Sequence, residues 1–229
     1  MRYVVYHGSR EIYGDMAASA KSLLAHTSVD KVFFLIEDGQ FPEPLPEIVE
    51  TIDVSRTIPQ IFHPRGPNYK SRWTPIGLAR LALTWILPDI DKILSIDADT
   101  VVMRDIGDIW DIDMGGAYFM AAKEPILTGQ RHMLYTNAGV TMFDLAALRQ
   151  SEMDRAMVEE LNSRRYTLVG QDVMNILCRG RIKELPSEYN ACAYTEPCNA
   201  PRILHYAGRS DWRGEPEAAK WRVAAWPVN

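Results

Sequence analysis

Apolar runs alternate with helical patterns along most of the chain. A continuous apolar run such as KVFFLIED at 31–38 is typical of a strand covered on both faces. The segment DMAASAKSLLAH at 15–26 has a helical pattern, with Asp15 expected as its N-cap. A second helix is expected over 74–87, with Thr74 as N-cap and Pro75 at the first helical position. Further strands are predicted at 2–7, 92–97, 117–124, 137–145, 181–186 and 202–208, and further helices at about 145–163 and 171–179.

The alternation of strands and helices predicts an α/β fold with a parallel or mixed sheet. In such sheets ligands bind at the carboxyl ends of the strands. No composition change or linker divides the chain, so we expect residues 1–229 to form a single domain.

Composition and charge narrow the classes of function. The chain has 229 residues, of which 47% are hydrophobic, and a net charge of −5, so it can build a core and lacks the basic excess of a nucleic-acid-binding protein. The first apolar run is too short for a signal peptide, and no run approaches the length of a membrane span. Its three cysteines form neither a disulfide framework nor a zinc pattern, which favours reduced thiols and a cytoplasmic location.

The segment KILSIDADTVV at 92–102 places Asp97 and Asp99 directly after a predicted strand. The pair has three interpretations: a polar strand end, the nucleophile and acid of a phosphatase, or two ligands of a metal ion. Residues i and i+2 at a strand end project to the same side, so both carboxylates can reach one cation. A divalent cation held in this way would neutralise a diphosphate leaving group.

The phosphatase interpretation has two difficulties. DADTV at 97–101 matches the Asp-x-Asp-x-Thr/Val signature of haloacid-dehalogenase-like phosphotransferases, and GDIWDID at 107–113 imitates their later acidic motif. However, this second motif begins only five residues after Val102, too soon to lie on another strand across the site. The signature also normally lies near the start of its domain, whereas nearly a hundred residues precede it here. This interpretation remains the alternative.

Other polar motifs follow in order along the chain. YTNAGVTMFD places Asn137 at the start of a predicted strand, and GQDVMN places Gln171 and Asp172 near a helix N-terminus. ILHYAGRSDW places His205 at a strand end and Gly208 in the next turn. Taken singly, each motif fits a turn, a helix cap or a surface histidine as well as it fits a functional site.

Together, LARLAL…DKILSIDADTVV, YTNAGVTMFDL, GQDVMN and HYAG resemble the retaining glycosyltransferases of family 8, over nearly the whole chain to about Trp212. The resemblance implies a GT-A, Rossmann-like fold with a mixed, mostly parallel sheet flanked by helices, a nucleotide-sugar donor that is usually UDP-linked, and Mn²⁺, with Mg²⁺ as the alternative ion. It implies Asp97, Asp99 and His205 as metal ligands and Gln171 beside the anomeric carbon. The full set of contacts to the nucleotide-sugar donor that it implies is Arg80, Asp97, Ala98, Asn137, Ala138, Gln171 and Gly208.

The chain departs from the family pattern in three places. Gly170 stands where an aspartate usually holds donor-sugar hydroxyls, and Asp211 stands where a lysine usually contacts the diphosphate. Arg209 or Arg213 could supply that missing charge. The loop after the first strand lacks the usual aspartates and offers instead the following base contacts: His7, Ser9 and Tyr13.

The expected function is therefore metal-dependent transfer of a hexosyl group to a hydroxyl acceptor with retention, where the acceptor is a glycan or a lipid-linked glycan such as lipopolysaccharide. Gln171 is not a carboxylate, so a front-face route is more economical than a covalent intermediate, and the role of Asp172 stays open. Contact of the tail at 220–229 with the inner membrane face would be at most peripheral. An inactive sugar-nucleotide binder is a further alternative, because of Gly170 and Asp211.

Overall fold

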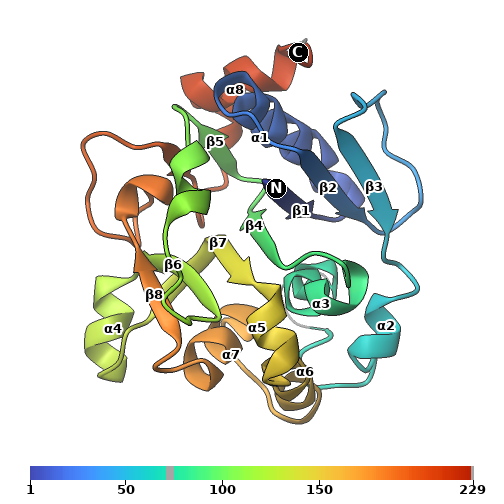
Figure 1. The fold of residues 1–229 in the computed structure, drawn as a ribbon. Helices are drawn as coiled ribbons and strands as arrows, with labels where there is room; N and C mark the ends of the chain where they lie inside the picture. The colour runs from blue at the N-terminus through green and yellow to red at the C-terminus, as the bar shows by residue number, and fades with distance from the viewer. Residues whose placement is uncertain (71–74, 228–229) are drawn as a thin grey trace.

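A seven-stranded sheet in the order β3-β2-β1-β4-β7-β6-β8 forms the centre of the computed structural model, which describes residues 1–70 and 75–227 (Figure 1). Within this sheet β7 alone runs against the other strands, because it pairs antiparallel with both β4 and β6. The expected mixed, mostly parallel α/β sheet is thus confirmed. Its strands are β1 (Tyr3–His7), β2 (Lys31–Ile36), β3 (Val49–Asp53), β4 (Lys92–Ile96), β6 (Phe119–Lys123), β7 (Thr136–Asp144) and β8 (Ile182–Leu185).

Both faces of the sheet are covered, which explains the continuous apolar runs. Successive residues of a strand point to opposite faces, so Phe33 and Leu35 enter one core cluster and Val32 and Phe34 enter the other. Helices α1 and α8 lie together on one side of the sheet, and α5, α6 and α7 lie on the other (Figure 1). The α-helices are α1 (Tyr13–His26), α2 (Ile58–Ile61), α3 (Leu83–Ile86), α4 (Pro125–Arg131), α5 (Leu145–Gln150), α6 (Met153–Ser163), α7 (Val169–Leu177) and α8 (Pro216–Val223).

A second, two-stranded sheet pairs β5 (Thr100–Val102) with β9 (Ile203–His205) in antiparallel register. Thr100 lies opposite His205 in this register, and Val102 lies opposite Ile203. The small sheet therefore brings a residue from near the end of the chain next to the segment that leaves β4.

The predicted helix over 74–87 is wrong in type over most of its length. The structure has a 3₁₀ helix, η2 (Pro75–Ala82), followed by the short α3, while Thr74 lies outside the described residues. The predicted helix at about 145–163 is divided into α5 and α6. Glu152 causes the division, because its left-handed backbone (φ 58°) cannot continue a right-handed helix.

The prediction that Asp15 caps its helix is also wrong. Helix α1 begins two residues earlier, at Tyr13, and the Asp15 side chain is buried within the first turn. Its carboxylate accepts hydrogen bonds from Arg213, with Nη2 to Oδ2 at 2.6 Å, and from Arg222. Asp15 therefore fastens the C-terminal segment to α1 instead of capping the helix.

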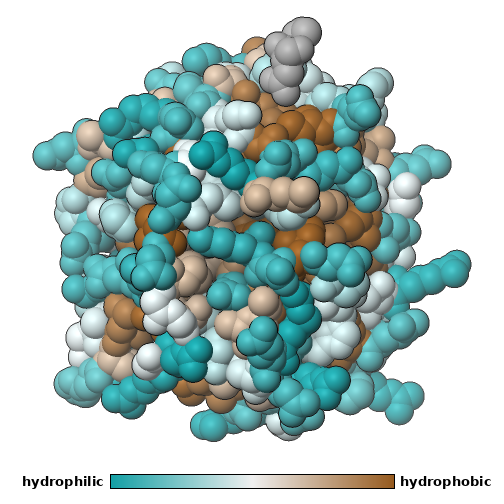
Figure 2. Space-filling view, in the orientation of Figure 1, coloured by the Kyte–Doolittle hydropathy of each residue, from teal (hydrophilic) through white to brown (hydrophobic). Residues whose placement is uncertain are grey.

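The surface seen in Figure 2 is mainly hydrophilic, and apolar areas lie between the polar side chains. Across residues 1–70 and 75–227, none of the helices combines the length and apolar character needed to traverse a bilayer.

Candidate active site

Two aspartates leave β4 at the edge of the sheet where the parallel strands end. The backbone N–H of Asp97 donates to the carbonyl of Gly139 on β7 at 2.7 Å, and the Asp99 carbonyl accepts from Tyr206 N at 2.9 Å. The Asp97 carbonyl also accepts from the Thr100 hydroxyl at 2.9 Å. These backbone bonds on both sides fix the turn that carries the two carboxylates.

His205 completes a three-residue group with these aspartates. Its Nε2 lies 3.3 Å from Asp99 Oδ1 and 3.8 Å from Asp97 Oδ2. One ligand atom from each residue lies within 4.8 Å of the others. Two carboxylates and an imidazole suit a divalent transition metal better than they suit an all-oxygen calcium site. The donor set and its spacing therefore fit the metal that the sequence resemblance implies.

Gly139 makes room for the histidine ring. A Cβ atom placed on Gly139 would lie 2.0 Å from His205 Cε1 and 2.5 Å from its Nδ1, far inside van der Waals contact. The glycine of the NAGV motif is thus required by the ring of a residue 66 positions later in the sequence. Any side chain on β7 at this point would displace His205 from the carboxylates.

Arg80 on η2 binds the other side of Asp97. Its Nη2 contacts Asp97 Oδ1, its Nη1 contacts the Ala138 carbonyl, and its Nε donates to His7 Nε2 at 3.2 Å. Burial alone would raise the pKa of Asp97, but Arg80, His205 and His7 together hold it below its usual value. Burial, followed by the charge of Arg80, lowers the pKa of His7 to about 4, so its ring is neutral and accepts the arginine N–H.

The second ring nitrogen of His205, Nδ1, is hydrogen-bonded to a buried amide. Its Nδ1 donates to Asn190 Oδ1 at 2.7 Å, and Asn190 is fully buried. Burial opposes protonation of the ring, but hydrogen bonds to Asp99 and Cys192 and the charges of both aspartates raise the pKa of His205 to about 10. The two carboxylates and the Asn190 oxygen thus stabilise a positive charge on the ring.

Glu124 is a site residue that the sequence analysis missed. It directly follows β6, is 5% exposed, and its Oε1 accepts from Asn137 Nδ2 at 2.7 Å and from Gln171 Nε2 at 3.1 Å. Burial raises its pKa although these two hydrogen bonds oppose the shift. Glu124 does not stand in a pattern that singles it out, because its partners lie on other elements.

Gln171 lies beside Glu124, and its amide orientation is defined. Its Oε1 accepts from the Ala138 N–H at 3.0 Å, while its Nε2 donates to Glu124. A carbonyl oxygen has two lone pairs, so one stays available for a ligand. The neighbouring Asp172 differs: it is 2% exposed, and its two oxygens accept from Arg131, from Tyr135 and from Leu168 N. Asp172 is thus a buried carboxylate with both oxygens hydrogen-bonded to the protein, which gives it a structural role.

The residues expected to contact the base lie in two environments. Tyr13 is 1% exposed, its ring stacks on Phe41 at 5.1 Å between centroids, and its hydroxyl donates to Asp38 at 2.7 Å. The prediction that Tyr13 can stack on a base is therefore wrong, because core packing already covers the ring. Ser9 lies in the loop after β1, where its hydroxyl donates to Glu11 at 3.2 Å.

A family model described as Glycosyl transferase family 8 matches residues 4–212. The chain belongs to glycosyltransferase family 8. The fold agrees with this family. A solved structure of the galactosyltransferase LgtC in complex with donor and acceptor sugar analogues superposes on the chain with a TM-score of 0.73. The two sequences are 19% identical, and the superposition covers 99% of this chain and 97% of that one. This family 8 chain therefore has the GT-A fold.

Curated relatives in the family are longer. Glycosyltransferase GlyE of Streptococcus pneumoniae is 25% identical over 201 residues, which is 82% of this chain and 47% of that protein. A lipopolysaccharide 1,2-glucosyltransferase of Escherichia coli is 31% identical over 117 residues, or 44% of this chain and 33% of that protein. The chain thus spans less than half the length of each of these two relatives.

The departures from the family pattern can now be placed. A Cβ on Gly170 would lie 3.3 Å from Leu81 Cδ1, so a side chain at this position would contact an apolar group. Gly208 has a left-handed backbone (φ 75°), and a Cβ on it would lie 2.6 Å from the Tyr194 hydroxyl. Arg209 pairs with Asp211 and Glu215 on the surface, whereas Arg213 is bound to Asp15.

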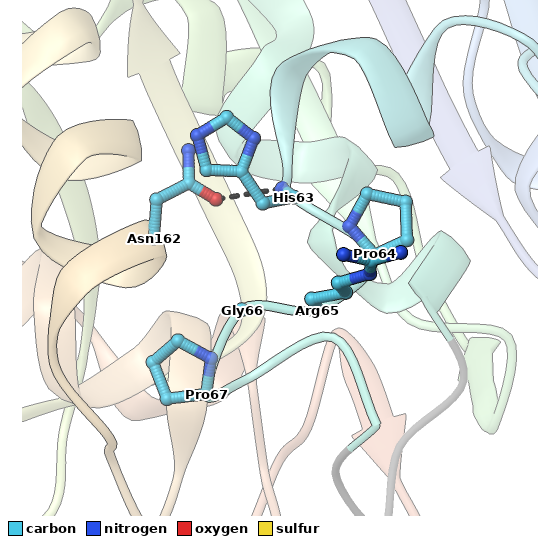
Figure 3. A pocket seen from close by; sticks show the side chains of 6 residues that line it. All are labelled: His63, Pro64, Arg65, Gly66, Pro67 and Asn162. Carbon is cyan, nitrogen blue, oxygen red and sulfur yellow. Dashed lines mark hydrogen bonds between the residues drawn. The ribbon is translucent and has the colours of Figure 1, made fainter.

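A separate depression lies between the segment 63–67, which follows α2, and helix α6. Figure 3 shows its lining, in which the His63 N–H donates to Asn162 Oδ1 at 2.8 Å. Its lining residues are His63, Pro64, Arg65, Gly66, Pro67 and Asn162. None of them belongs to the group around Asp97, Asp99 and His205, so this depression is separate from that group.

Proposed function

We propose that this chain is a metal-dependent retaining hexosyltransferase that moves a sugar from a nucleotide diphosphate donor, UDP-linked in our assignment, to a hydroxyl acceptor. The observation that carries the proposal is the convergence of Asp97, Asp99 and His205 at the carboxyl edge of the sheet. Gln171 lies in the hydrogen-bond network next to this group, where the family places it beside the donor sugar.

Asp97, Asp99 and His205 would hold the metal, which we assign as Mn²⁺ with Mg²⁺ as the alternative. When bound, such an ion supplies positive charge to a diphosphate leaving group. An imidazole among the ligands favours Mn²⁺ over the harder ions Ca²⁺ and Mg²⁺. Arg80 holds Asp97 in place, and its buried guanidinium adds a second positive charge at this edge of the site.

The carbonyl oxygen of Gln171 can stabilise positive charge that develops on the donor sugar. Departure of a diphosphate gives the sugar ring oxocarbenium character. The Gln171 carbonyl keeps one lone pair free and is oriented by the Ala138 N–H, so it can face that positive charge without any rearrangement. An amide is a poor nucleophile, and the Asp172 carboxylate is buried with both oxygens hydrogen-bonded to the protein. Both facts favour a front-face route, with the acceptor hydroxyl attacking on the side from which the diphosphate leaves.

Arg213 is the better candidate to replace the lysine missing at Asp211. Arg213 donates hydrogen bonds to the Asp15 carboxylate, and these bonds, with the charges of Asp15 and Asp99, raise the pKa of Arg213, so its guanidinium is positively charged. Arg209 instead pairs with two surface carboxylates. We expect Arg213→Ala to weaken UDP binding about tenfold, the effect of one lost charge-assisted contact. Arg222→Ala, which also removes a partner of Asp15, is the matched control and should leave UDP affinity unchanged.

The phosphatase alternative is not favoured. Its second acidic motif forms the 3₁₀ helix η3 (Gly107–Asp111), where Asp108 pairs with Arg202 at 2.9 Å and accepts from the Tyr189 hydroxyl at 2.8 Å. Among the described residues, the metal-binding group of Asp97, Asp99 and His205 does not include Asp108.

For the acceptor we propose a glycan or lipid-linked glycan in the cytoplasm, with at most peripheral contact between the C-terminal segment and the membrane. The assignment rests on relatives whose names include a lipopolysaccharide glucosyltransferase.

A direct test is to incubate the protein with UDP-glucose, UDP-galactose and UDP-N-acetylglucosamine, with Mn²⁺ or with EDTA, and to follow the anomeric signals by NMR. We expect slow Mn²⁺-dependent hydrolysis of one donor, with the α-sugar released first, and none by Asp99→Asn. Release of phosphate from an aryl phosphate with Mg²⁺ would instead support the phosphatase. Binding of UDP without turnover of any donor would support the inactive binder.

A further inference from the structure

A chain of buried hydrogen bonds leads from Glu124 to the metal-binding group. Glu124 Oε1 accepts from Asn137 Nδ2 at 2.7 Å, and Asn137 Oδ1 accepts from Asn190 Nδ2 at 3.0 Å. Asn190 Oδ1 in turn accepts from His205 Nδ1 at 2.7 Å. All four side chains are at least nine-tenths buried, so water does not compete for these bonds.

Asn137 determines which group donates and which accepts in this series of hydrogen bonds. Its Oδ1 also accepts from the backbone N–H of Gly139 at 2.9 Å, and a backbone N–H can only donate. A buried Glu124 carboxylate can only accept, so it requires the NH₂ end of the same amide. Reversing Asn137 would place donor against donor at Gly139 and acceptor against acceptor at Glu124.

The orientation passes from Asn137 to His205. Because Asn137 presents its oxygen, Asn190 must present its NH₂ group to it and therefore its carbonyl oxygen to the ring. An oxygen that faces His205 Nδ1 requires a proton on that nitrogen. The opposite nitrogen, Nε2, is then the one that lies 3.3 Å from Asp99 Oδ1 and is directed at the metal position.

The structure assigns Glu124 and Asn190 as positioning residues, which we propose orient the His205 ring and keep Nε2 as its metal-ligating atom. Glu124 also accepts from Gln171 Nε2, so one carboxylate oxygen orients both the metal ligand and the amide beside the donor sugar. This inference rests on the metal centre of the proposed function. Outer partners of this kind typically change metal affinity 10- to 100-fold when they are removed.

The test is Mn²⁺ affinity without turnover, measured from the free-Mn²⁺ electron paramagnetic resonance signal during titration of the folded protein. We expect Asn190→Ala and Glu124→Ala each to weaken Mn²⁺ binding at least tenfold. Glu124→Gln should stay within about threefold of the wild type, because a single carbonyl oxygen can accept both bonds that Oε1 now accepts.

Asn68→Ala is the matched control for a buried amide. Asn68 is 3% exposed and donates to the carbonyls of Leu161 and Arg164, outside this chain of hydrogen bonds. It should lower the melting temperature and leave Mn²⁺ affinity unchanged. If Asn190→Ala does not fold, the comparison of Glu124→Ala with Glu124→Gln makes the same test at the other end of the chain.

Wild-type affinity in both alanine variants would overturn the inference, and so would a Glu124→Gln variant as weak as Glu124→Ala, because charge and not orientation would then matter. Failure of the wild type to bind Mn²⁺ would overturn the metal centre itself. The two failures are therefore distinguishable.

Discussion

Replacing Gly139 by alanine is expected to move His205 out of the metal-binding group. The added Cβ would lie 2.0 Å from His205 Cε1, whereas ordinary contact begins at 3.4 Å. The ring would therefore have to shift by about 1.4 Å, which is the difference between these two distances. A metal site tolerates deviations of only about 0.2 Å in its ligand distances, so the displaced ring could no longer act as a ligand.

The expected effect is large. Loss of an outer partner of a metal ligand typically lowers affinity 10- to 100-fold. Loss of the ligand itself should reach at least the upper end of that range, roughly 100-fold or about 3 kcal/mol. The assay is Mn²⁺ titration followed by electron paramagnetic resonance, with the melting temperature recorded to confirm that the variant is folded.

A double-mutant cycle separates this effect from general damage to the fold. In a His205→Ala background the ring is absent, so Gly139→Ala should cause no further loss of Mn²⁺ affinity and should be better tolerated. Gly129→Ala on α4 is the control, since a Cβ there meets nothing within 4 Å. A folded Gly139→Ala protein that binds Mn²⁺ like the wild type would refute the reasoning.

The remaining predictions concern stability. The pKa of His7 is about 4 in the folded chain, below the ordinary value near 6.5, so the unfolded chain binds the proton first as pH falls. The free energy of unfolding should therefore fall between pH 6.5 and 4, by at most about 3 kcal/mol, and urea denaturation at several pH values should find this dependence weaker in His7→Gln. An equal slope in both proteins would contradict the assignment. Asp15→Asn weakens the ion pairs of the buried Asp15 carboxylate with the partly exposed Arg213 and Arg222, and should cost about 2 kcal/mol of stability in the same assay; an unchanged midpoint would count against it. Tyr135→Phe removes a buried bond to Asp172 and should cost about 1 kcal/mol without changing Mn²⁺ affinity, and a change in that affinity would assign the hydroxyl to the site.

The sequence pattern was sufficient for six of the seven strands of the main sheet and for the two carboxylates, but it missed the edge strand β3. Strand periodicity placed Asp97 and Asp99 at a strand end, where two residues spaced i and i+2 can converge. His205 came from the family resemblance and not from any pattern, because its approach depends on the pairing of β5 with β9. That pairing joins positions about a hundred residues apart, which local periodicity does not reveal.

The errors have a common physical cause. Tyr13 was expected to stack on a base and Asp15 to cap a helix, yet both are buried by partners distant in sequence, Phe41 and Arg213 respectively. Glu124 was missed for the same reason. It is significant only because tertiary packing brings it to Asn137 and Gln171.

The central claim is that Asp97, Asp99 and His205 form a metal centre for the diphosphate of a sugar-nucleotide donor. Isothermal titration calorimetry of UDP into the protein, with Mn²⁺ and with EDTA, tests it most directly. We expect binding that requires Mn²⁺ and falls at least 100-fold in Asp99→Asn. Equal UDP affinity with and without Mn²⁺, or in the wild type and Asp99→Asn, would contradict the claim.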